Sequence, residues 1–166
     1  MTDDAADRHV ARWRDHWIDI PFDPQVEGVV VRIGLLMRYL RSTKEEAAAK
    51  VGLQGFEYDT LHSLMIRDTP GVASPGSLAN DLGVSPAGIS GRLDSLEKAG
   101  YLQRSPGPDD RRKIIVEVTA AGADIWRRAM TVRSTAEEDL VKVLDAAEQK
   151  TLNRLLKKMM LSIETD

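Results

Sequence analysis

The sequence predicts a mainly α-helical fold with a small β-hairpin, and three consecutive patterns support this prediction. Two short helical patterns, over residues 77–82 and 86–98, are separated by a glycine turn at Gly83. A charged pattern rich in β-branched residues follows over 102–118 and predicts two antiparallel strands. In this order the patterns predict a winged helix-turn-helix, whose second helix can enter a DNA major groove while the hairpin reaches the flanking backbone.

Three helical patterns precede this region. The first covers about residues 9–20, the second is longer and runs over about 26–50, and the third covers about 56–67. Prolines end the first pattern and glycines end the second. The first carries an apolar stripe at helical spacing, formed by Val10, Trp13, Trp17 and Ile20.

Two further helices are expected after the hairpin. One runs over about 119–144, and the next begins at a capping box formed by Asp145 and Glu148. The last helix carries a long apolar stripe, formed by Leu152, Leu155, Leu156, Met159, Met160 and Ile163.

The helices at the two ends of the chain are too apolar on one face to stand alone. We expect them to pack together and against a second copy of the chain, as a helical dimerisation region. The alternative is that they cap the core of a monomer. The expected organisation is N-terminal helices of the dimerisation region over 1–52, a winged helix-turn-helix lobe over 53–118 and C-terminal dimerisation helices over 119–166.

Composition excludes several classes of protein. The 166 residues are 42% hydrophobic and contain no cysteine, so disulfides, thiolate metal sites and cysteine redox sensing are excluded. We find no signal peptide and no apolar run of about 20 residues, which predicts a bacterial cytoplasmic, nucleoid-associated protein without a membrane partner. The three histidines lack zinc-site spacing, and no phosphate-binding glycine loop or nucleophile motif is present. We therefore predict no catalytic residue, no metal and no cofactor.

The charges are distributed unevenly. The formal net charge is only -3, so a nucleic-acid partner has to be argued from where the charges lie. Residues 1–27 contain three arginines and seven carboxylates, whereas 86–113 contain six basic and four acidic residues. The local excess of positive charge falls on the predicted second helix and hairpin.

The helix over 86–98 has one apolar side and one side of small residues. Ser85 suits the N-cap and Pro86 the first helical position. Small side chains permit close approach to DNA but offer few groups for direct base reading. The glycines in this helix weaken it, so something other than helix propensity has to account for them. The candidate DNA-binding residues here are Ser85, Pro86, Ala87, Ser90 and Gly91.

The hairpin supplies a second set of candidate DNA-binding residues: Arg111, Arg112 and Lys113, at or near its tip. Such a cluster suits contact with phosphates and with a narrow minor groove. Alone it would be an ordinary solvated loop, and a helix-turn-helix can also serve as a protein-interaction module. Its position directly after the second helix favours DNA binding.

Four segments together resemble the MarR family of bacterial transcription regulators: LANDL at 78–82, RLDSLEKAGYL at 92–102, DRR at 110–112 and VTAAG at 118–122. The resemblance extends over essentially the whole chain. It implies an obligate homodimer that binds palindromic promoter DNA, usually as a repressor, and is released by a small, often phenolic or anionic, ligand. The sequence departs from the family at Asp109, where the family often has an arginine.

A narrower resemblance, to the urate-responsive branch of the family, implies a ligand site formed by Trp17, Asp59, Arg92 and Arg104. Helical spacing places Arg92 on the flank of the apolar stripe of its helix, pointing toward the protein. A ligand anion could then compete with Asp59 for the arginines and shift the helix. The alternatives are an ordinary salt bridge with a core tryptophan, and a winged-helix protein without small-molecule control.

Overall fold

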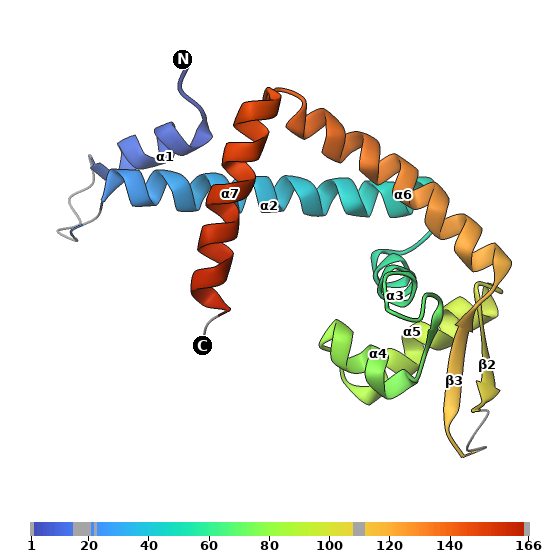
Figure 1. Ribbon diagram of the computed structural model, residues 1–166. Coiled ribbons are helices and arrows are strands. Elements are labelled where there is room, and N and C mark those ends of the chain that lie inside the picture. Colours follow the sequence, from blue (N-terminus) through green and yellow to red (C-terminus); the bar gives the residue numbers. More distant parts are fainter. Residues whose placement is uncertain (1, 15–20, 22, 108–111, 165–166) are drawn as a thin grey trace. The chain divides into compact units, whose positions relative to one another are not determined.

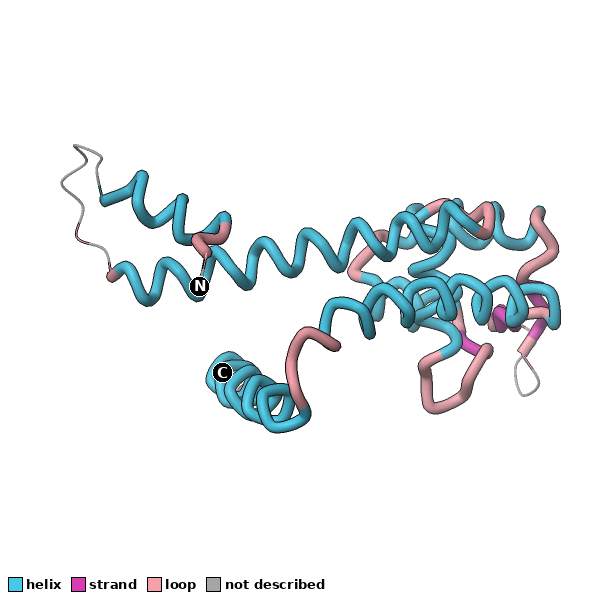
Figure 2. The backbone as a smooth tube through the Cα atoms, turned by 90° about the horizontal axis from the view of Figure 1, so that it is seen from above, coloured by secondary structure: helices cyan, strands magenta, loops and turns pink. Residues whose placement is uncertain are grey.

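The protein is mostly helical, with one small sheet (Figure 1, Figure 2). A computed structural model describes residues 2–14, 21, 23–107 and 112–164. The described residues form seven helices and three strands. In chain order these are α1 (Ala5–Arg14), α2 (Pro24–Lys50), α3 (Gly55–Met65), β1 (Val72–Ala73), α4 (Pro75–Leu82), α5 (Pro86–Lys98), β2 (Leu102–Pro106), β3 (Ile114–Val118), α6 (Ala120–Val141) and α7 (Ala146–Ile163). The predicted fold class is confirmed.

The chain divides into two compact units, Met1–Glu45 and Glu46–Asp166. None of the helices in the described residues combines the length and apolar character that crossing a membrane requires.

In the first unit α1 begins at Ala5, earlier than the predicted start near residue 9. Asp4 caps it, because its Oδ1 accepts the backbone N–H groups of Ala6 at 2.8 Å and Asp7 at 2.9 Å. Arg32 of α2 donates to Asp4 at 2.9 Å and to Asp7 at 2.6 Å, which pins α1 to α2. The hydrogen bond from the Asp7 backbone and the Arg32 guanidinium lower the pKa of Asp4 to about 2. The predicted end of this helix, with Trp17 and Ile20, lies outside the described residues.

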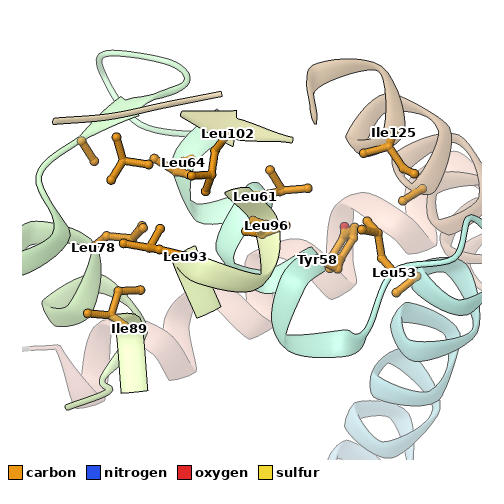
Figure 3. Close-up of a cluster of buried hydrophobic side chains, with 14 of the residues drawn as sticks. Leu53, Tyr58, Leu61, Leu64, Leu78, Ile89, Leu93, Leu96, Leu102 and Ile125 are labelled. Atoms are coloured by element: carbon orange, nitrogen blue, oxygen red, sulfur yellow. The ribbon is translucent and has the colours of Figure 1, made fainter. Parts of the chain in front are cut away.

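The second unit is built around one apolar core (Figure 3). Helices α3, α4 and α5 each contribute leucines that are almost completely buried, and the sheet adds Leu102 and Val116. Arg67, just after α3, donates to Asp81 and Ser77 of α4 and ties these two helices together at the surface. The hydrophobic core therefore fixes α5 relative to α3 and α4.

The turn between α4 and α5 explains why the two helices form a helix-turn-helix. Ser74 caps α4, and α4 ends at Gly83, whose φ of 61° is the left-handed conformation that favours glycine. Ser85 then caps α5 by accepting the N–H of Gly88 at 3.1 Å. The sequence predicted both this turn and the limits of α5.

The sheet has the order β1-β3-β2 and is antiparallel throughout. The predicted hairpin is present as β2 and β3, with Leu102 opposite Val118 and Pro106 opposite Ile114. The sequence analysis missed β1, because two residues are too short to show an alternating pattern.

Helix α6 is anchored to α3 by polar contacts at the edge of the core. Trp126 Nε1 donates to Nδ1 of His62 at 3.2 Å, and Arg133 donates to the hydroxyl of the buried Tyr58 at 3.2 Å. Since α6 directly follows β3, these contacts join the hairpin to the helical core.

Helix α7 begins with the predicted capping box, in which Asp145 accepts the N–H of Glu148 and Glu148 accepts the N–H of Asp145. None of the residues of α7 is buried. Its apolar stripe is exposed along its length, from 41% at Leu156 to 70% at Ile163. Within the described residues of the second unit, this face stays largely accessible.

Candidate nucleic-acid interface

The exposed side of α5 carries the residues predicted to contact DNA. The opposite side is the core side, where Ile89, Leu93 and Leu96 are 0–2% exposed. The candidate residues Ser85, Pro86, Ala87, Ser90 and Gly91 are all exposed. The arrangement leaves an accessible helix surface lined by small side chains.

The β2–β3 hairpin, which we call the wing, presents positive charge beside this surface. Pro106 and Ile114 are the last pair of the β2–β3 ladder, and the Gly107 N–H donates to the carbonyl of Lys113 at 2.7 Å. Arg112 and Lys113 are exposed at the start of the returning strand. Arg111 and the acidic pair before it lie outside the described residues.

Arg104 connects the wing to α5. Its Nη1 lies 2.6 Å from Oδ1 of Asp94 and 3.3 Å from Oε2 of Glu97. Its Nη2 donates to the Ser90 carbonyl at 3.3 Å, and its backbone N–H donates to Oε1 of Glu97 at 3.1 Å. One arginine thus contacts three residues along the exposed side of α5.

Arg92 has a different environment. Its guanidinium carbon lies 6.0 Å from the centre of the Phe56 ring of α3, a distance typical of a cation–π contact. This agrees with the orientation toward the protein expected from helical spacing. Asp59, one turn after Phe56, lines an open pocket of about 340 Å³ on α3 and α4, together with His62 and Arg67.

Of the three predicted ligand residues that the structure describes, Arg92 and Arg104 are not brought together. Since Arg104 contacts residues 90, 94 and 97, and about 100° separates successive helical residues, it lies on nearly the opposite side of α5 from Arg92. Trp17 lies outside the described residues. The ligand-binding role of Trp17, Asp59, Arg92 and Arg104 stays a prediction.

The sequence did not reveal the carboxylates that fix α5 to the neighbouring helix and strand. Glu57 is 92% buried and accepts the hydroxyl of Ser95 at 2.6 Å and the N–H of Gln54 at 2.8 Å, which fixes α5 against the start of α3. Asp94 and Glu97 were counted only as charges. Their spacing of three residues on one side of a helix next to a basic strand was the signal that could have paired them with Arg104.

Comparison with known proteins places the chain in a family. The MarR family model matches residues 59–114. The HTH-type transcriptional regulator PecS of Dickeya dadantii is 30% identical over 89% of this chain and 87% of its own length. The HTH-type transcriptional repressor NicR of Pseudomonas putida is 32% identical over 87% of this chain and 92% of its own length.

Solved structures agree with this placement. A mutant MarR from E. coli superposes with a TM-score of 0.63 at 26% identity and covers 76% of this chain and 95% of its own. A mutant MarR from E. coli complexed with operator DNA gives a TM-score of 0.58 at 25% identity, over 78% of this chain and 94% of its own. The relatives are transcription regulators and not enzymes. The fold and the similarity to PecS and NicR over most of their length lead to one conclusion: this chain belongs to the MarR family of transcriptional regulators.

Proposed function

We propose that the protein is a homodimeric repressor that binds palindromic promoter DNA and is released by a small aromatic or anionic ligand. The observation that carries the proposal is the accessible side of α5, lined by small residues and flanked by a cationic wing. This arrangement matches the docking of a recognition helix in the major groove, with a wing on the adjacent backbone. The solved MarR complex with operator DNA supports it by analogy.

The two parts of this surface have different tasks in the proposal. Small residues such as Ala87, Ser90 and Gly91 let the backbone of α5 approach base edges closely, so that hydroxyl and methyl contacts read the sequence. Arg111, Arg112 and Lys113 neutralise phosphates, which contributes affinity that depends little on sequence but strongly on salt. Specificity therefore comes from α5 and from DNA shape, and affinity from the wing.

Dimerisation is supported by two uncovered apolar faces. Helix α7 exposes the stripe from Leu152 to Ile163, and α2 exposes Val30, Leu36 and Met37, each 46–58% accessible. Apolar faces of this extent mark association surfaces in soluble proteins. A two-fold dimer presents two recognition helices to half-sites about one turn of DNA apart.

Ligand control is the finer part of the proposal. NicR is named a repressor, and the residue types Trp17, Asp59, Arg92 and Arg104 are those that the family resemblance implies for an anionic aromatic ligand. A ligand releases DNA only if it binds the DNA-free conformation more tightly. Titration of urate and simple phenolic acids into the protein–DNA complex tests this part, and release by none of them would contradict it.

Selection of genomic DNA fragments by the purified protein tests the main proposal. We expect the selected fragments to share one inverted repeat, with half-sites about 10 base pairs apart. Selected fragments that share no sequence, and that the protein binds no more tightly than bulk DNA, would contradict sequence-specific regulation. Selected fragments that share a single half-site without a repeat would contradict the proposed dimer but not sequence-specific binding.

A further inference from the structure

The exposed side of α5 presents a problem for any DNA complex, because it carries carboxylates. Asp94 points away from the core side and its side chain is 61% exposed, and that of Glu97 is 40% exposed. Both lie on the same side of the helix as Ser90, which belongs to the proposed DNA surface. A duplex approaching this surface brings phosphates close to two negative charges, and this repulsion opposes binding.

Arg104 resolves this conflict within the protein. Its guanidinium contacts Asp94 at 2.6 Å and Glu97 at 3.3 Å and is itself only 26% exposed. A cation placed between two carboxylates cancels much of their field at the helix surface. Its third contact, a hydrogen bond from Nη2 to the Ser90 carbonyl, ties the guanidinium to α5 at another point.

The same contacts fix the wing relative to α5. Glu97 forms an ion pair with the guanidinium of Arg104 and accepts a hydrogen bond from its backbone N–H, so strand β2 is attached to α5 through side chain and main chain. Exposed ion pairs contribute little to folding stability. The effect of this group on DNA binding is therefore expected to exceed its effect on the fold.

We propose that Arg104 is a positioning residue for DNA binding, which masks the carboxylates of Asp94 and Glu97 on the recognition helix and holds the wing beside it. This inference rests on the proposed DNA-binding function. It assigns Arg104 a task in the unliganded protein, separate from contact with a ligand. It also makes α5 and the wing one recognition unit.

A thermodynamic cycle tests the inference on the sequence selected by the wild-type protein. Arg104→Ala should weaken binding about tenfold, because it uncovers two carboxylates facing phosphates. The loss should shrink as salt is raised, since salt screens exposed charges. In a chain that also carries Asp94→Asn and Glu97→Gln, the same Arg104→Ala change should leave the DNA affinity almost unchanged. Arg104→Lys, which keeps the charge without the planar fork, should retain part of the affinity.

A second pair serves as the matched control. Arg127 and Asp124 form an ion pair at 3.7 Å on α6, so Arg127→Ala removes the same charge away from the recognition helix. Its effect should be small and independent of Asp124→Asn. Thermal melting of each variant checks that the fold is kept.

The outcomes separate the two proposals. If wild-type protein selects no sequence, the proposed function is wrong. If it selects one but Arg104→Ala binds as tightly as wild type, the positioning role is wrong. If Arg104→Ala is equally harmful with and without the two carboxylates, Arg104 acts on DNA directly and the inference is overturned.

Discussion

Gly122 lies in the first turn of α6 and packs against the backbone of Tyr101, the residue just before β2. A Cβ added at Gly122 would lie 1.9 Å from the carbonyl oxygen of Tyr101 and 2.9 Å from Cγ1 of Val118. The Tyr101 carbonyl also accepts the N–H of Thr119 at 3.0 Å, so it cannot move without losing that hydrogen bond. A glycine is therefore required here by close backbone packing.

Gly122→Ala is expected to lower the free energy of unfolding by about 3 kcal/mol, because overpacking against backbone forces the helix and the strand apart. Chemical denaturation measures the change. Gly76→Ala in α4 is the matched control, since an added Cβ there meets nothing within 4 Å. Equal stability of the two variants would show that α6 does not pack against Tyr101 as described.

The two arginines show how far single residues could be predicted. Helical spacing was sufficient to place Arg92 toward the protein, because position within one helix depends only on local sequence. The partners of Arg104 come from α5, ten and seven residues away, and depend on how β2 packs against that helix. That packing is tertiary, so periodicity could not reveal it.

At the scale of elements, α5 has a well-packed apolar side that faces the core and an exposed side that includes a residue of low helix propensity. Gly91 lies on the exposed side, does not have a positive φ and leaves open space around an added Cβ. Neither backbone conformation nor packing within the chain requires glycine there. The proposed close approach of α5 to DNA would give a physical reason for glycine at this position.

Gly91→Ala should therefore change fold stability and DNA affinity in opposite directions. The free protein should become about 1 kcal/mol more stable, because alanine is the better helix former. Binding to the selected DNA should weaken about tenfold, because the added methyl group enlarges the surface that enters the groove. Melting curves and fluorescence anisotropy measure the two effects.

Gly55→Ala is the control for this element, because an added Cβ at the first position of α3 also meets nothing within 4 Å. We expect it to leave DNA affinity unchanged. Unchanged affinity of Gly91→Ala would contradict close approach at this position.

Caps and periodicity predicted most elements, and the failures have physical causes. Ser85 and Asp145 cap α5 and α7 as expected, since capping is a local hydrogen bond. The start of α1 was missed because Asp4 was counted as a charge, although it is the cap. The strand β1 depends on pairing with β3 across more than 40 residues of chain, which no local pattern encodes.

At the scale of the whole molecule, the accessible apolar face of α7 is the surface that we propose for dimerisation. Leu156→Glu should prevent the proposed dimer and weaken DNA binding with it, because a buried unpaired charge is costly and each half-site then binds alone. Sedimentation at several protein concentrations measures the association state.

Lys157→Glu is the matched control, since Lys157 is exposed and points away from the apolar stripe of α7. This variant should remain dimeric. A well-folded monomeric Leu156→Glu that binds the selected DNA like wild type would exclude α7 as the dimer interface.

The central claim is that α5 reads DNA sequence while the wing supplies affinity. Its most direct test is the ratio of affinities for the selected sequence and for a scrambled duplex, measured for wild type, Ser90→Ala and Lys113→Ala. Wild type should prefer the selected sequence about 1,000-fold. Ser90→Ala should lower this ratio, whereas Lys113→Ala should weaken both duplexes alike and reduce the salt slope by about one. A wild-type ratio near one, or a ratio that Ser90→Ala leaves unchanged while Lys113→Ala lowers it, would contradict the claim.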